Sequence, residues 1–77
     1  MLTTRRVKLT YPPQLLERPI IYEVIKRFDI VTNIRLANAT REQGWLVVEF
    51  GGEPGAIDAA LAWIAAQGIQ IEPAQED

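Results

Sequence analysis

Residues 29–51, D-I-V-T-N-I-R-L-A-N-A-T-R-E-Q-G-W-L-V-V-E-F-G, set the architecture of this chain. They hold two runs rich in aliphatic and β-branched residues, joined by a polar connection at residues 38–44. Successive residues of a strand point to opposite faces of its sheet, so this alternation predicts a β-hairpin with one buried and one open face. The residues expected on the buried face are Ile30, Ile34, Leu36, Leu46, Val48 and Phe50.

The segments that flank the hairpin each supply a strand and a helix. Alternating residues 4–11 predict a strand, which the following Pro12 and Pro13 end. Apolar residues at helical spacing predict helices over residues 19–28 and 54–67, each with proline at its start. Residues 69–72 predict a short last strand, and Trp63 is expected to be a partly buried packing residue of the second helix.

The resulting order of elements is β-α-β-β-α-β. Two right-handed crossovers around a hairpin predict an α+β, ferredoxin-like fold with four antiparallel strands in the order 4-1-3-2 and both helices on one face. The strand that carries Asn33 then lies at an edge. We expect residues 1–77 to form a single domain with a frayed tail at residues 73–77. A core this small is marginal, which favours a homodimer or a covalently attached neighbour.

Composition narrows the classes of function. The 77 residues include no cysteine and no histidine, which argues against disulfides, thiolate metal sites and iron–sulfur clusters, and removes the commonest general base at neutral pH. A net charge of −2 argues against nucleic acid as the main partner. No signal peptide or apolar run of membrane-spanning length is present in the sequence, so we expect a cytoplasmic protein without membrane insertion. We expect neither a cofactor nor a metal.

The open sheet face is the candidate functional surface. Asn33 is the residue of most interest, because asparagine is depleted in strands and its amide both donates and accepts hydrogen bonds. Arg35, expected on the same face, offers a fork for a carboxylate. Val31, Trp45 and Val47 would add an apolar patch suited to contact with a partner. The alternative is an ordinary solvated sheet face with cross-strand pairs between basic residues and glutamate.

Three segments also resemble the NIL domain: V-T-N-I-R-L at residues 31–36, then residues 44–52, and residues 56–72 ending in G-I-Q-I-E. The family takes its name from an Asn-Ile-Leu motif, which here reads Asn33-Ile34-Arg35. The resemblance implies a ferredoxin-like module of the kind found on methionine ABC importer ATPases, on some ferredoxins, and as free-standing bacterial and cyanobacterial proteins. It implies a homodimer that binds methionine, with Asn33, Ile34 and Arg35 at the ligand-binding motif and Ile34 in the core beneath.

Two hypotheses therefore stand side by side. The first is a regulatory or sensory module that binds a small amino acid such as methionine at a sheet-face or edge-strand dimer surface. The second is an interaction module that docks on a ferredoxin or transporter and binds no metabolite. An enzyme is not expected: Arg18 and Asn33 match the acylphosphatase pattern in type, but the strand–helix loop lacks the glycine-containing phosphate cradle. The aromatic pattern of RNA-binding sheets and the P-loop motif are also absent from the sequence.

Overall fold

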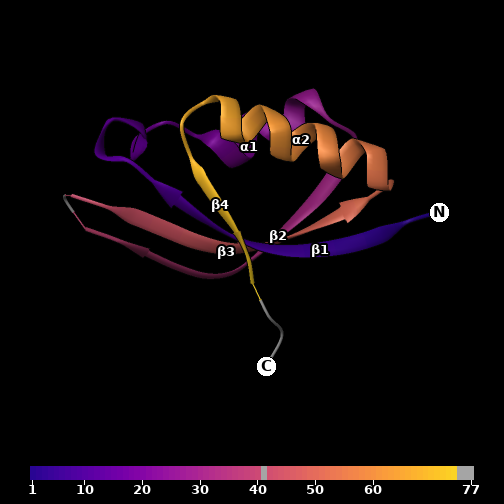
Figure 1. The fold of residues 1–77 in the computed structure, drawn as a ribbon, viewed down its shortest axis with the longest axis horizontal. Helices are drawn as coiled ribbons and strands as arrows, with labels where there is room; N and C mark the ends of the chain where they lie inside the picture. The colour runs from indigo at the N-terminus through magenta and orange to yellow at the C-terminus, as the bar shows by residue number, and fades with distance from the viewer. Residues whose placement is uncertain (41, 75–77) are drawn as a thin grey trace.

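A computed structural model describes residues 1–40 and 42–74 and has the predicted order of elements. The elements are β1 (Thr3–Tyr11), a 3₁₀ turn η1 (Pro13–Leu15), α1 (Ile20–Arg27), β2 (Ile30–Ala39), β3 (Gly44–Gly52), α2 (Pro54–Ala66) and β4 (Gln70–Pro73). The sheet order is β2-β3-β1-β4 with antiparallel neighbours, which is the predicted order read from the other edge. Both helices lie on the same face of this sheet (Figure 1). The ferredoxin-like prediction is confirmed.

The hydrophobic core lies between the helix layer and the sheet. Strands β1 and β3 contribute Leu9, Val48 and Phe50, all with no exposed surface. The helices cover these side chains with Val24 of α1 and with the apolar stripe of α2, which includes Ile57. Because alternate residues of the same strands point away from this core, the register of the core also fixes which residues occupy the open face.

Strand β2 departs from the predicted alternation at Arg35. Ile34 lies opposite Val48, but Leu36 lies opposite Val47, the next residue along β3. Arg35 is therefore the extra residue of a β-bulge. The bulge exchanges the two faces for the residues that follow, so Leu36 points to the open face and is 61% exposed.

Three expectations about β2 were wrong. Leu36 is not a core residue, and Arg35 does not continue the regular row that starts at Asn33. Ile34 does share the helix-facing side with buried Val48, yet it is 50% exposed, so its placement in the core was wrong. The physical reason is that β2 is the edge strand and receives cover from only one neighbouring strand.

The two hairpin strands and the last strand, β4, extend further than predicted. The hairpin strands extend to Ala39 and start again at Gly44, so the connection is shorter than residues 38–44. Strand β4 includes Pro73, and the Ala74 N–H donates to the Arg6 carbonyl oxygen at 3.1 Å. The expected frayed tail therefore does not include residues 73 and 74, and residues 75–77 lie outside the described part of the chain.

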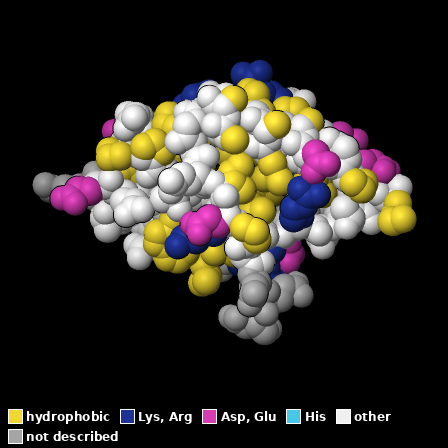
Figure 2. Space-filling model, viewed as in Figure 1, with side chains coloured by type: hydrophobic (Ala, Val, Ile, Leu, Met, Phe, Trp, Pro, Cys, Tyr) yellow, Lys and Arg dark blue, Asp and Glu magenta, His cyan; other side chains and the backbone are white. Residues whose placement is uncertain are grey.

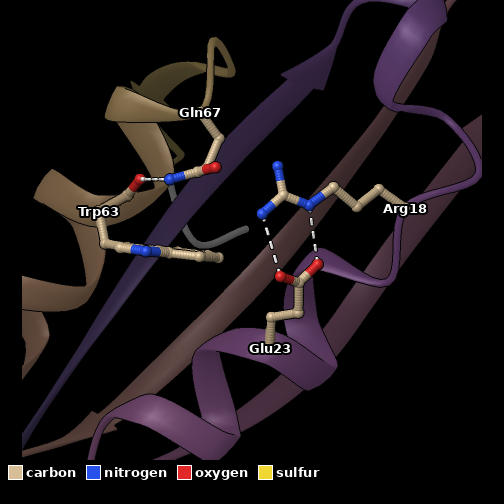
Figure 3. Close-up of polar contacts among 4 residues, drawn as sticks. All are labelled: Arg18, Glu23, Trp63 and Gln67. Atoms are coloured by element: carbon tan, nitrogen blue, oxygen red, sulfur yellow. Dashed lines mark hydrogen bonds and ion pairs between the residues drawn. The ribbon is translucent and has the colours of Figure 1, made fainter.

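Trp63 of α2 is a partly buried packing residue, as predicted, and its ring lies on the side of α2 that faces Arg18 and Glu23 (Figure 3). Its ring lies 4.9 Å from the Arg27 guanidinium carbon and 5.7 Å from that of Arg18. Arg18 donates from Nε and Nη2 to the two carboxylate oxygens of Glu23, at 2.9 and 3.0 Å. This hydrogen bonding lowers the pKa of Glu23. Because Arg18 contacts both Glu23 of α1 and Trp63 of α2, the connection before α1 is tied to both helices. Gln67 Nε2 donates to the Trp63 carbonyl oxygen at 3.2 Å, a contact within the end of α2.

Candidate functional site

The open face of β2 and β3 brings together four of the residues singled out from the sequence. Asn33 lies opposite Glu49, and Val31 lies opposite Gly51. Val47 and Trp45 follow on β3, opposite Leu36 and Asn38. Directly paired residues of antiparallel strands point to the same face, so these side chains form one surface. We call it the β2–β3 open face.

Asn33 is exposed on this face, and its side chain makes no hydrogen bond to the residues that the structure describes. Val31, two positions before it, is 71% exposed. Leu36 replaces Arg35 as the next regular residue of the row. The amide of Asn33 is thus a polar group with aliphatic neighbours, an arrangement that can orient a small ligand by hydrogen bonds while its apolar part rests on the valine and leucine.

The charges of the β2–β3 open face and of adjoining β1 are largely matched within the sheet. Arg6 of β1 donates to Glu49 Oε2 from Nη2 at 2.9 Å and from Nε at 3.3 Å. Their side chains are only 16% and 22% exposed, so this ion pair is better shielded than an ordinary surface pair. Lys8 Nζ lies 5.0 Å from the centre of the Trp45 ring, a cation–π contact. The face therefore presents no single sign of charge that would attract a polyanion.

Exposed hydrophobic side chains gather along β2 and the adjoining helix. Among the described residues, the large hydrophobics that are clearly exposed outside the N-terminus are Tyr22, Ile25, Val31, Ile34 and Leu36. The first two belong to α1 and the other three to the edge strand β2. An edge strand also offers unpaired backbone N–H and C=O groups. This margin has the features of a contact surface. On the side of the molecule shown in Figure 2, by comparison, hydrophobic side chains are interrupted by basic and acidic groups that touch one another.

A hollow of about 480 Å³ lies between the start of α1 and the far end of the hairpin. Its lining includes Tyr11, Ile21, Tyr22, Ala37 and Leu46. Burial raises the pKa of the Tyr11 phenol to about 12. This hollow is not evident from the sequence, because its walls come from residues 11–22, 37–39 and 44–46, which only folding brings together.

Within residues 1–40 and 42–74, no group of three or more acidic side chains is arranged to hold a metal ion. No helix among them has the length and apolar character needed to cross a bilayer.

Comparison with known proteins places this architecture in a family. The model of the NIL domain matches residues 5–73. Methionine import ATP-binding protein MetN 1 of Burkholderia ambifaria is 33% identical over 70 residues, which cover 86% of this chain and 20% of that protein. Methionine import ATP-binding protein MetN of Helicobacter hepaticus is 38% identical over 58 residues, which cover 70% of this chain and 16% of that protein.

A solved structure shares the fold. The C-terminal domain of an ABC transporter/ATP-binding protein from Enterococcus faecalis superposes with a TM-score of 0.78 at 19% identity, over 95% of this chain and 86% of that one. Fold and open face together define a small ferredoxin-like module. The chain belongs to the NIL domain family. It spans about a fifth of the length of the curated relatives it matches.

Proposed function

We propose that this chain is a regulatory binding module that takes a small amino acid such as methionine on its β2–β3 open face. The observation that carries the proposal is the position of Asn33, an exposed amide on the edge strand of a NIL domain, with aliphatic side chains on either side. The methionine import proteins to which the chain is similar support methionine as the first ligand to test. The proposal assigns the chain no catalytic step.

The chemistry of the face suits such a ligand. The Asn33 amide donates from Nδ2 to a carboxylate and accepts at Oδ1 from an ammonium group. Val31 and Leu36 are exposed on the same face and supply apolar contact for a side chain such as a thioether. Because Arg6 and Glu49 pair with each other, this part of the face carries both signs of charge, which suits a zwitterion without net charge.

A homodimer would complete this surface. The margin formed by α1 and β2 exposes Tyr22, Ile25 and Ile34 beside an open strand edge. Association of two copies along this edge would pair backbone groups and remove these side chains from water. A small domain gains proportionally more from such burial than a large one does.

Calorimetric titration with L-methionine tests the proposal directly. The wild-type chain is expected to bind, and Asn33→Ala is expected to weaken binding by about tenfold or more, because it removes hydrogen bonds to charged groups of the ligand. Asn38→Ala is the matched control, since Asn38 is also an exposed asparagine on the open face of β2. Equal binding by both variants, or no heat with the wild type at millimolar methionine, would contradict the proposed ligand site.

A second candidate function is docking on a transporter or ferredoxin without a metabolite. The region similar to this chain makes up only 20% of the methionine import protein of Burkholderia ambifaria, so a NIL domain can work beside other domains. Purified importer or ferredoxin from the source cell would then bind this chain in the absence of amino acid. Trp45→Ser, which removes the largest side chain of the β2–β3 open face, should weaken that contact while leaving any methionine binding at Asn33 in place.

A further inference from the structure

We propose that Glu49 binds the α-ammonium group of the ligand and is the residue by which this site selects amino acids over carboxylic acids that lack an amino group. The inference rests on the proposed function of the β2–β3 open face and adds a second polar contact to it.

The register brings Glu49 to the side of Asn33. The two residues are direct partners across β2 and β3, before the bulge interrupts the pairing at Arg35. Side chains of such partners start about 5 Å apart and share a face. A group the size of an amino acid head can therefore contact both the carboxylate and the amide.

The hydrogen bonds from Arg6 engage one oxygen of Glu49. Both hydrogen bonds from Arg6 end on Oε2, at 2.9 and 3.3 Å. Within the described part of the chain, Oε1 accepts no hydrogen bond. An ionised carboxylate only accepts, so an ammonium group with three donors is a complementary partner for this oxygen.

Arg6 gives the carboxylate a fixed position. With 22% of its side chain exposed, Glu49 is reachable from solvent yet shielded enough to strengthen an electrostatic contact. Arg6 is thus a positioning residue, whereas Glu49 touches the ligand. The ligand's carboxylate is then bound by the Asn33 amide and by the open backbone edge of β2. The ligand's apolar side chain packs against the next row, which is formed by Leu36 and Val47.

The experiment compares two probes on three proteins. The probes are L-methionine and 4-(methylthio)butanoate, which has the same chain and carboxylate without the amino group. The proteins are the wild type, Glu49→Gln and Arg6→Gln. The last two variants break the same ion pair, but Arg6→Gln keeps the carboxylate. Calorimetry gives each affinity, and thermal unfolding checks that each variant is folded.

The wild type is expected to prefer L-methionine by about tenfold or more, the usual size of one charge-assisted hydrogen bond. Glu49→Gln should lose this preference by weakening methionine binding, with little change for the deaminated probe. Arg6→Gln should retain most of the preference. If Glu49→Gln keeps the wild-type preference, or if both variants lose it equally, the inference fails while the proposed function stands. If the wild type binds neither probe, both are overturned.

Discussion

Asn33 of β2 lies directly opposite Glu49 of β3, on the face of the sheet turned away from both helices. Glu49 is in turn held by Arg6 of β1 at 2.9 Å, so a row of three polar residues crosses three strands. The rows on either side of it carry the aliphatic side chains of Val31, Leu36 and Val47. A polar row bordered by aliphatic rows can orient a small zwitterion and hold its apolar part.

Self-association should depend on Leu36, the exposed leucine that the bulge in β2 turns to the open face. Leu36→Glu places a charge on the edge strand and is expected to shift the chain to a monomer in sedimentation experiments, because like charges would meet at the dimer contact. The cost to folding should stay within about 0.5 kcal/mol, since Leu36 is 61% exposed. Ala62→Glu is the control, because Ala62 is exposed on α2 and is not part of the margin formed by α1 and β2, and this variant should leave the dimer intact. A wild-type chain that sediments as a monomer would contradict the dimer.

The buried phenol of Tyr11 should make folding sensitive to alkali. Its pKa is about 12 when folded against 10.0 for the free side chain, so the unfolded chain loses its proton first as pH rises. The stability that this phenol contributes is present below pH 10 and is lost towards pH 12, amounting to about 1 kcal/mol by pH 11. Urea unfolding between pH 8 and pH 11 measures this loss. Tyr11→Phe should show a flatter profile than the wild type, and identical profiles would refute the assignment.

Trp63 should be the most sensitive residue at the contact between the helices. Trp63→Ala removes the ring that Arg27 and Arg18 cover and that meets Phe28 edge-on at 6.5 Å. The free energy of unfolding is expected to fall by about 2–3 kcal/mol, a shift of roughly 10 °C in Tm for a domain of this size. Tyr22→Ala serves as the comparison, because Tyr22 is 61% exposed and should cost far less in the monomer.

Two glycines should respond to alanine in opposite directions. Gly52, at the end of β3, has a φ of +154°, and a Cβ there would lie 3.2 Å from the Asp29 carbonyl oxygen. Gly52→Ala is therefore expected to destabilise the fold by about 1–3 kcal/mol. Gly55 lies in the first turn of α2 with open space around it, so Gly55→Ala should stabilise by about 0.5–1 kcal/mol. Chemical denaturation of both variants checks the signs, and a stable Gly52→Ala would show that the strand end is more tolerant than its geometry indicates.

The sequence was sufficient for the elements and their order because the period of the apolar residues changes clearly from two to helical spacing and back. The apolar stripe of α2, from Ile57 to Ile64, lies in the core as expected. Asn33 and Trp45 were also correctly assigned to the open face, because Asn33 precedes the bulge in β2 and because the extra residue lies in β2, which leaves the alternation of β3 unbroken.

The features that could not be predicted from the sequence depend on how distant segments pair. The bulge at Arg35 has no local signature, and a single extra residue was enough to move Leu36 from the expected core to the surface. The partnership of Glu49 with both Arg6 and Asn33 depends on two strand registers at once. The hollow beside Tyr11 needs three segments to be folded before it exists.

The most direct test of the ligand surface is an amide NMR titration of the ¹⁵N-labelled chain with L-methionine. We expect the largest shift changes at residues 31–36 of β2 and at Val47 to Glu49 of β3, with small changes in α2. Changes confined to the hollow lined by Ile21, Tyr22 and Ala37, or a spectrum unchanged at millimolar methionine, would contradict the assignment of the β2–β3 open face as the binding site.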